Sequence, residues 1–314
     1  MINLSAKRVC ITGASGFLGS PLVTEIAKRG CRQIFTPRHE DFDLCTQDGV
    51  RKLFEEVPID IVIHAAGFVG GIGFAQSKPG EMFYRNALMG ILMMEEARKA
   101  SVQKYVQIGT VCEYPKYTSV PFNEVDLWYG YPEETNASYG VAKRALLTMG
   151  QAYREQYKFN VIHLLLGNMY GPNDDFNLDT SHVIAALVHK FVSAKKNGET
   201  QVVVWGDGSA SREFLYVKDA AEAIVNATEL YDEPEPVNIG SGFQILIKDL
   251  VSTIAELVGY TGGIVYDESK PNGQMRRALD VSRSWNKFGF VADTGLKDGL
   301  RKTIDWYTEH ESKS

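Results

Sequence analysis

Short apolar stretches alternate with longer stretches of helical pattern through the first half of this 314-residue chain. Strands that are separated by helices pair in parallel, so this alternation predicts an α/β fold in which helices cover both faces of one doubly wound parallel sheet. The expected strands are 8–12, 33–36, 59–64, 105–108 and 161–165, and the expected helices are 17–29, 49–55, 82–100 and 139–157.

Three glycines, Gly13, Gly16 and Gly19, lie between the first strand and the first helix. Glycine at this junction permits a tight turn, close approach of backbone N–H groups to a pyrophosphate, and close helix–strand packing. The loop alone is also compatible with a simple turn, but its place at the first strand–helix junction favours a dinucleotide-binding Rossmann fold. The residues expected to touch the cofactor here are Gly13, Ser15, Gly16, Phe17 and Leu18.

The end of the second strand indicates which dinucleotide binds. An acid at this point commonly holds a ribose 2′-hydroxyl, whereas an arginine accommodates a 2′-phosphate. No acid stands at the strand tip and Arg38 does, which favours NADP over NAD. Asp43 and Leu44 are expected to border the adenine. The small residues Ala65, Ala66 and Gly67 after the third strand would let the nucleotide lie against the backbone.

Tyr139 and Lys143 lie four residues apart in an expected helix, so both side chains leave the same face. The lysine charge favours a phenolate and should lower the tyrosine pKa from about 10, although one lysine rarely brings it to neutrality. A bound, positively charged nicotinamide could supply part of the remainder. Thr110 follows the strand 105–108, at the sheet edge where ligands bind, and its hydroxyl could bond a ketone oxygen. Together the three residues predict an acid–base site, although a tyrosine–lysine pair alone can be incidental.

The remaining chain predicts a second, smaller unit. The pattern loosens after residue 171, with expected helices at 182–196, 218–231, 246–258 and 296–307, strands at 202–205 and 237–239, and a break at 232–236. We therefore expect residues 1–170 to form the NADP-binding Rossmann domain, with segments near 215–240 returning to it. Residues 171–314 should form mainly a smaller α/β C-terminal substrate-binding domain.

Composition excludes several classes of function. The net charge of −6 argues against a nucleic-acid-binding surface. No apolar run is long enough to span a bilayer, and the short segment before the first strand leads us to expect no signal peptide. The four cysteines lack the paired spacing of a disulfide framework or zinc site, so we expect no metal and a cytoplasmic location. They are Cys10, Cys31, Cys45 and Cys112.

Several longer motifs resemble those of the GDP-L-fucose synthase family, within the extended short-chain dehydrogenase/reductase superfamily. The resemblance runs along nearly the whole chain. It is carried by AAGFVGGI (65–72), GTVCEYP (109–115), NASY (136–139) with Lys143, GNMYGP (167–172), SHVI (181–184), VWGDG (204–208) and REFLYV (212–217). The glycine loop and the tyrosine–lysine pair belong to the superfamily, whereas the contexts of Cys112 and His182 point to the family.

The resemblance implies an enzyme that epimerises GDP-4-keto-6-deoxy-D-mannose at C3 and C5 and then reduces C4 with NADPH. Tyr139 and Thr110 would stabilise the C4 oxygen, and Tyr139 would supply its proton. Inversion needs an acid and a base on opposite faces of the sugar. By resemblance Cys112 and His182 fill these roles, and their ordinary pKa values, about 8.5 and 6.5, suit proton exchange near neutrality. His182 is also expected beside the cofactor.

The resemblance also implies substrate contacts and an assembly. The positions that match GDP-sugar-binding residues are Asn168, Lys190, Trp205, Arg212 and Arg277. Cations suit the diphosphate, and an aromatic ring suits a base or sugar face. Superfamily members imply a homodimer formed through the helices 82–100 and 139–157.

Departures from the family pattern leave other activities open. Phe68 stands where the family commonly has lysine or methionine, and Leu166 replaces a proline before Gly167. Both lie near the substrate pocket, so alternatives are reduction, or epimerisation with reduction, of a related GDP-4-keto sugar such as a heptose, and a sugar-nucleotide 4-epimerase. A regulatory NADPH sensor is a rival of another class, but a sensor does not need Thr110, Tyr139 and Lys143.

Overall fold

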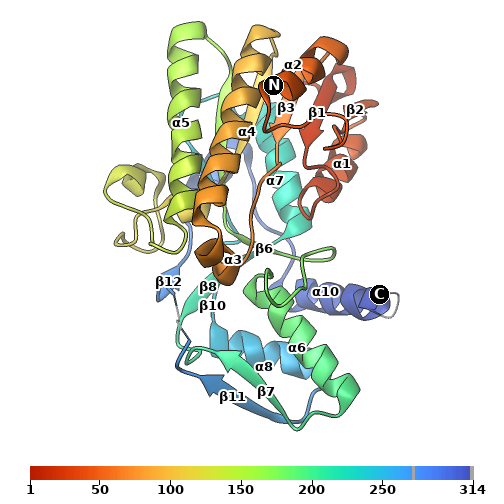
Figure 1. Ribbon diagram of the computed structural model, residues 1–314, viewed down its shortest axis with the longest axis vertical. Coiled ribbons are helices and arrows are strands. Elements are labelled where there is room, and N and C mark those ends of the chain that lie inside the picture. Colours follow the sequence, from red (N-terminus) through yellow and green to blue (C-terminus); the bar gives the residue numbers. More distant parts are fainter. Residues whose placement is uncertain (271–272, 312–314) are drawn as a thin grey trace.

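A six-stranded parallel sheet forms the centre of the protein in the computed structural model, which describes residues 1–270 and 273–311 (Figure 1). The strand order is β2-β1-β3-β4-β5-β9, which reverses direction at β1 and so confirms the doubly wound α/β fold. The strands are β1 (Arg8–Thr12), β2 (Gln33–Phe35), β3 (Ile61–His64), β4 (Lys104–Thr110), β5 (Val161–Leu166) and β9 (Val237–Ile239).

Helices cover both faces of this sheet. On one face α1 packs beside α7, and on the other α2, α4 and α5 lie side by side (Figure 1). The inner strands β1, β3 and β5 are almost wholly buried, which explains why the sequence shows mainly apolar runs there rather than alternation, whereas the edge strand β2 is partly exposed. These helices are α1 (Gly19–Lys28), α2 (Gln47–Glu56), α4 (Pro79–Lys99), α5 (Ala137–Tyr157) and α7 (Val217–Leu230).

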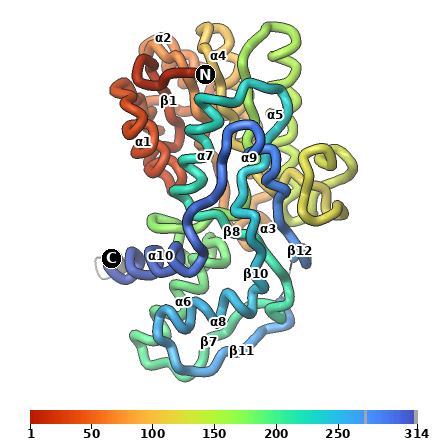
Figure 2. The backbone as a smooth tube through the Cα atoms, turned by 180° about the vertical axis from the view of Figure 1, so that it is seen from behind, coloured from red at the N-terminus to blue at the C-terminus, as the bar shows by residue number. Residues whose placement is uncertain are grey.

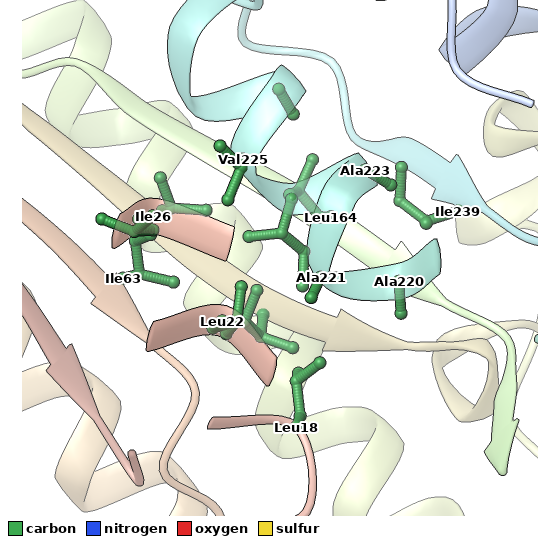
Figure 3. Packing of buried hydrophobic residues seen from close by; sticks show 14 of the residues in the cluster. Leu18, Leu22, Ile26, Ile63, Leu164, Ala220, Ala221, Ala223, Val225 and Ile239 are labelled. Atoms are coloured by element: carbon green, nitrogen blue, oxygen red, sulfur yellow. The ribbon is translucent and has the colours of Figure 1, made fainter. Parts of the chain in front are cut away.

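The core between the sheet and the α1–α7 pair depends on small side chains. Ala220, Ala221 and Ala223 of α7 let that helix approach the sheet and the larger Leu22 and Ile26 of α1 (Figure 3). All five are buried, and close packing of this kind leaves little room for a change of volume. Helix α7 and strand β9 therefore complete the nucleotide-binding layers, although they follow the expected boundary at residue 170 by more than 40 positions.

The remaining elements form a smaller layer at the carboxyl edge of the central sheet (Figure 2). Strand β8 pairs with β6, β10 and β12, while β7 pairs with β11. The strands are β6 (Asn168–Tyr170), β7 (Gln201–Trp205), β8 (Ser211–Tyr216), β10 (Gln244–Leu246), β11 (Gly263–Asp267) and β12 (Arg276–Arg277). The helices of this layer are α6 (Val183–Asn197), α8 (Ile247–Val258) and α10 (Leu296–Glu311), and the short helix α3 (Ile72–Ser77) lies near it. Helix α9 (Ser282–Phe288) packs instead against α7 and β9 of the central sheet.

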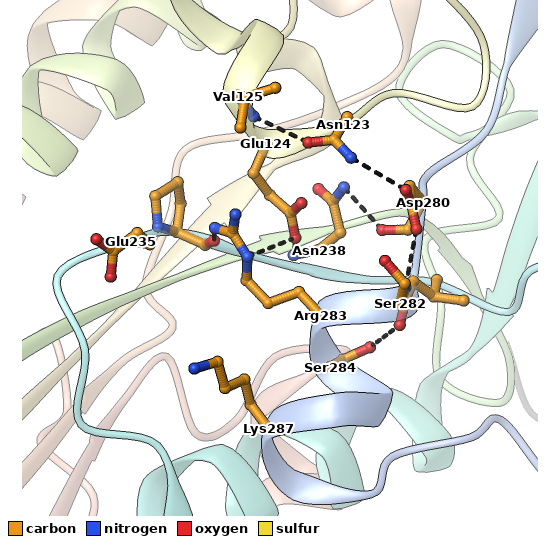
Figure 4. A network of polar contacts seen from close by, with 12 residues as sticks. Asn123, Glu124, Val125, Glu235, Asn238, Asp280, Ser282, Arg283, Ser284 and Lys287 are labelled. Carbon is orange, nitrogen blue, oxygen red and sulfur yellow. Dashed lines mark hydrogen bonds and ion pairs between the residues drawn. The ribbon is translucent and has the colours of Figure 1, made fainter.

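A polar network ties the last strand of the sheet to distant parts of the chain. The Asn238 amide donates to the carbonyls of Phe122 (2.9 Å) and Asp280 (3.0 Å), and its backbone N–H donates to Glu124. Glu124 also lies 3.9 Å from the guanidinium of Arg283 (Figure 4). Because these polar groups are mostly buried and paired, the network fixes the segment before α9 against the β9 edge.

Candidate active site

The glycine loop after β1 lies against the end of β3. Gly13 adopts φ +69°, and a Cβ at that position would stand 2.8 Å from the Ala66 Cα. A Cβ at Gly19 would stand 2.5 Å from the Ala14 Cα, so any larger residue would push the loop away from the start of α1. Helix α1 begins at Gly19 rather than at the expected residue 17, because residues 13–18 remain in the loop. The structure thus brings two predicted cofactor segments, 13–18 and 65–67, together.

A buried threonine–histidine pair fixes this junction. Thr12 Oγ1 accepts the backbone N–H of Ala66 at 3.1 Å and lies 2.9 Å from His64 Nδ1. Burial, followed by the charge of Lys143, lowers the pKa of His64 to about 3, so its ring is neutral and shares one hydrogen bond with the Thr12 hydroxyl. We did not single out either residue from the sequence. A histidine ending an otherwise apolar strand was the available signal.

Arg38 lies beyond β2, the strand next to β1, on the same edge of the sheet. Its side chain is 74% exposed, and its Nε lies 3.4 Å from the equally exposed Glu40 carboxylate. A contact this exposed holds the guanidinium weakly, so Arg38 can turn toward a phosphate. Asp43 and Leu44 follow in the same loop, where Asp43 Oδ1 accepts the backbone N–H of Cys45 at 2.9 Å.

Thr110 and Cys112 belong to one tight turn at the end of β4. This turn is the 3₁₀-helix η2 (Val111–Glu113), for which Thr110 is the N-terminal cap. Thr110 Oγ1 accepts the Cys112 N–H at 3.2 Å, and the Glu113 carboxylate accepts the Thr110 N–H at 2.8 Å. These reciprocal bonds form a capping box, which holds the hydroxyl and the thiol at fixed relative positions.

Helix α5 brings Tyr139 and Lys143 against this turn. A Cβ at Gly140 would lie 3.0 Å from the Cys112 carbonyl carbon and closer still to its oxygen, so the helix and turn touch through bare backbone. The Lys143 ammonium lies 5.7 Å from the centre of the Tyr139 ring and donates to the Ile108 carbonyl at 2.9 Å. The structure therefore gathers Thr110, Cys112, Tyr139 and Lys143 at one end of the sheet.

The protein's own groups shift the pKa of Tyr139 in the direction opposite to the one that its pairing with Lys143 predicts. Burial raises the tyrosine pKa, and the neighbouring Cys112 and Glu113 raise it further. Burial likewise lowers the pKa of Lys143 to about 8, with Glu113 opposing that shift. Desolvation dominates both shifts, because Lys143 is buried and the half-buried Tyr139 is packed among protein atoms. The phenol is thus held in the protonated form that can donate to a sugar oxygen.

His182 approaches from the other side of the carboxyl edge, just before α6. Its loop leans on the segment after β3, because the Gly71 N–H donates to the Thr180 carbonyl at 2.6 Å and a Cβ at Gly71 would stand 3.1 Å from the Ser181 carbonyl carbon. The His182 side chain is exposed at the surface. Neighbouring protein atoms nevertheless desolvate the ring and so lower the pKa of His182, whereas the charge of Asp175 raises that pKa. Among the described residues His182 has no hydrogen bond to Cys112, so their joint action on one sugar stays a prediction.

Two arginines meet beside the thiol. Arg212 and Arg277 are register partners on the parallel strands β8 and β12, and Arg277 Nη1 lies 3.8 Å from Cys112 Sγ. Burial, followed by the charge of Arg277, lowers the pKa of Arg212 to about 10. Two adjacent guanidiniums repel each other, and a diphosphate would relieve that repulsion. Both were predicted substrate residues, and the structure brings them together.

The other predicted substrate residues, Asn168, Trp205 and Lys190, lie on β6, β7 and α6 of the smaller layer. Asn168 donates to the Glu213 carbonyl at 3.1 Å, which ties β6 to β8. Trp205 is 51% exposed, and the ammonium of Lys190 lies 5.8 Å from its ring centre. Lys270, which we did not select from the sequence, lies 5.3 Å from the same ring. An exposed ring flanked by two cations can stack on a base while the cations attract phosphate.

In residues 1–270 and 273–311 no three acidic, cysteine or histidine side chains gather closely enough to hold a metal ion. Over the same residues no helix combines the length and apolar character needed to cross a membrane.

Comparison with known proteins places this site in a family. Residues 9–240 match the model of the NAD dependent epimerase/dehydratase family. The chain belongs to that family. It is 37% identical to "Putative GDP-L-fucose synthase 2" of Arabidopsis thaliana over 99% of this chain and 94% of that protein. It is 34% identical to "GDP-L-fucose synthase" of Escherichia coli (strain K12), covering 99% of each.

Comparison with solved structures agrees with this assignment. A GDP-6-OMe-4-keto-L-xylo-heptose reductase from C. jejuni superposes with a TM-score of 0.92 at 26% identity, covering 98% of this chain and 99% of that one. A GDP-L-fucose synthetase from Naegleria fowleri, bound to NADP, gives a TM-score of 0.87 at 26% identity, covering 98% and 96%. The relatives confirm the resemblance to the GDP-L-fucose synthase family that the sequence motifs carry.

Proposed function

We propose that this protein is an NADPH-dependent 3,5-epimerase/4-reductase that converts GDP-4-keto-6-deoxy-D-mannose to GDP-L-fucose. The observation that carries the proposal is the contact of α5 with the η2 turn at Gly140, which gathers a hydroxyl, a thiol, a phenol and an ammonium at one strand end. The choice of substrate rests on the GDP-L-fucose synthase relatives, which the chain matches over nearly its full length.

The loop between β1 and α1 fits a dinucleotide. A Cβ at Gly13 would fill the space against Ala66, so the glycine keeps the backbone low enough for a pyrophosphate to lie over the N-terminus of α1. Arg38 would hold the 2′-phosphate, and Lys143 would bind the nicotinamide ribose. NADPH supplies the hydride that reaches C4.

Epimerisation uses the acidity of the carbons beside the C4 ketone. Thr110 and Tyr139 donate hydrogen bonds to the C4 oxygen, which bears the negative charge when a proton leaves C3 or C5. Cys112 and His182 then act from opposite faces, one removing a proton and the other returning one. Arg277 donates a hydrogen bond to the Cys112 sulfur at 3.8 Å.

Reduction follows once both centres are inverted. The C4 oxygen takes its proton from Tyr139, whose raised pKa keeps the phenol protonated until the oxygen becomes basic. Arg212 and Arg277 hold the diphosphate, and Trp205 stacks on the guanine. These contacts keep the sugar at the η2 turn through the successive steps.

A C4 reductase of a GDP-4-keto-heptose is the second candidate. It is favoured by the similarity to the C. jejuni heptose reductase and by Phe68, which departs from the fucose synthase pattern and whose ring centre lies 5.1 Å from that of Phe74. We also propose that the protein is cytoplasmic and forms a homodimer. The dimer interface would pair α4 and α5 of two copies, because the apolar side chains of Phe83, Tyr84 and Ile91 on α4 are exposed.

The decisive assay follows NADPH absorbance with GDP-4-keto-6-deoxy-D-mannose and then identifies the product. Oxidation of NADPH with formation of GDP-L-fucose is expected. Turnover confined to a GDP-4-keto-heptose would assign the second candidate. NADPH binding without oxidation by any 4-keto sugar nucleotide would indicate a sensor and contradict both.

A further inference from the structure

A row of polar side chains crosses the central sheet beneath α4 and α5. Thr12, His64, Gln107 and His163 are successive register partners on β1, β3, β4 and β5, and each is buried. Buried polar groups in a sheet core destabilise the fold unless they are paired. The Thr12–His64 end serves the cofactor loop. At the other end of the row, His163 contacts the Glu113 carboxylate in the η2 turn.

His163 is bound to Glu113. Its Nε2 lies 3.0 and 3.1 Å from the two carboxylate oxygens, and because a carboxylate only accepts, Nε2 carries the proton. The other ring nitrogen has no hydrogen-bond partner among the described residues. Gly109 makes the pairing possible, since a Cβ there would stand 2.5 Å from Glu113 Oε1. The hydrogen bonds that the His163 ring makes to described residues therefore all go to the Glu113 carboxylate.

Glu113 is anchored at both its side chain and its backbone. The side chain, which is fully buried, accepts the Thr110 N–H at 2.8 Å. The carbonyl accepts from Arg144 Nε, and Arg144 Nη1 donates to the Gly130 carbonyl at 2.8 Å. Glu113 thus links β4, β5 and α5 at the turn that carries Thr110 and Cys112.

The charge of Glu113 acts on the groups around it. The titratable or charged groups that face it are Tyr114, Tyr139, Lys143, Arg144 and His163. Its carboxylate raises the pKa of Lys143 against the lowering by burial, and raises that of Tyr139 in the same direction as burial. Both effects keep protons on the two groups at neutral pH.

We infer that Glu113, held by His163, is a positioning residue that fixes the Thr110–Cys112 turn against the Tyr139–Lys143 face of α5 and places a buried carboxylate beside it. This inference rests on the proposed reductase function. It adds the buried residues Glu113 and His163 to the groups that the proposed function places on the sugar, which are Thr110, Cys112, Tyr139 and His182.

The pH profile of kcat tests the electrostatic part. Glu113→Gln keeps an oxygen for the Thr110 N–H but removes the charge, so the pKa values of Lys143 and Tyr139 fall. The basic limb of the profile should then move down by about one pH unit or more, while KM for NADPH stays within about threefold. Glu124→Gln is the matched control, because Glu124 is a buried acid that also caps a backbone N–H. Its profile should match that of the wild type.

Two further variants test the geometric part. His163→Phe removes the N–H that holds the carboxylate, and kcat should fall about tenfold or more at unchanged KM. His163→Gln presents an amide N–H at a similar reach and should restore most of kcat. These variants leave Glu113 in place, so they carry the test even if Glu113→Gln does not fold.

A measurement without turnover separates this inference from the proposed function. Maleimide labelling of Cys112, followed by peptide mass spectrometry, should be several times faster in Glu113→Ala than in the wild type or in Glu124→Gln, because the turn loses its cap. Wild-type protein that fails to oxidise NADPH would defeat the proposed function alone. Unchanged labelling in Glu113→Ala, or an unshifted basic limb in an active Glu113→Gln, would overturn the inference.

Discussion

Replacing Gly140 by alanine tests whether catalysis depends on the close approach of α5 to the η2 turn. The new Cβ would fall well inside 3.0 Å of the Cys112 carbonyl oxygen, a separation that real Cβ atoms do not show. Helix and turn must therefore separate by about 1 Å, and misplacement of this size can lower kcat about 100-fold. Overpacking costs about 1–3 kcal/mol of stability, which the better helix propensity of alanine offsets by about 1 kcal/mol.

Gly80→Ala is the matched control. Gly80 lies in the first turn of α4, and a Cβ there meets nothing within 4 Å, so this variant should keep wild-type kcat and equal or higher thermal stability. The assay is NADPH oxidation with GDP-4-keto-6-deoxy-D-mannose at saturating substrate, beside a thermal melt. A Gly140→Ala enzyme with the kcat of the Gly80→Ala enzyme would refute the geometric reasoning.

Three other predictions concern cofactor, substrate and stability. Arg38→Ala should raise KM for NADPH about 10- to 100-fold, because a charged hydrogen bond to the 2′-phosphate is lost, and should leave KM for NADH within about threefold of the wild type. Equal changes in the two KM values would count against the 2′-phosphate contact. Trp205→Ala should raise KM for the GDP-sugar about tenfold with kcat little changed, in steady-state kinetics, because stacking on a base is lost. Lys104, buried on carbonyls of α7, has its pKa lowered to about 8, so the folded state binds fewer protons than the unfolded state above that pH. Urea denaturation of the wild type and of Lys104→Met gives the difference between their unfolding free energies at each pH. That difference should therefore increase in favour of the wild type by at most about 3 kcal/mol between pH 8 and 10. A difference that decreases over this range would contradict the prediction.

The central sheet could be predicted because most residues of its strands are apolar and helical patterns separate the strands along the chain. The same reasoning missed β8, whose Arg212 and Glu213 interrupt the apolar pattern. Those charges are tolerated because the Glu213 carboxylate accepts the N–H groups of Gly242 (2.9 Å) and Leu279 (2.6 Å), which lie far away in the sequence. Strands held by such long-range contacts give no local signal.

Part of the site was also accessible from the sequence. The glycine loop, Thr110, Tyr139 and Lys143 carry their chemistry in local spacing, and the structure brings them together at the ends of neighbouring strands. Glu113 and His163 could not be recognised as a pair, since they lie 50 residues apart and meet only through the register of β4 and β5. The direction of the Tyr139 pKa shift was likewise hidden, because burial is a property of the folded chain.

The most direct test of the proposed chemistry is turnover of GDP-4-keto-6-deoxy-D-mannose with NADPH in heavy water, with the product examined by NMR. If Cys112 and His182 exchange protons at the carbons beside the ketone, the wild-type product should be inverted at C3 and C5 and carry deuterium at both. The double variant Cys112→Ala, His182→Ala should yield a product that is reduced at C4 but not inverted. Inversion of both centres by the double variant, or a wild-type product without deuterium at C3 and C5, would contradict this account.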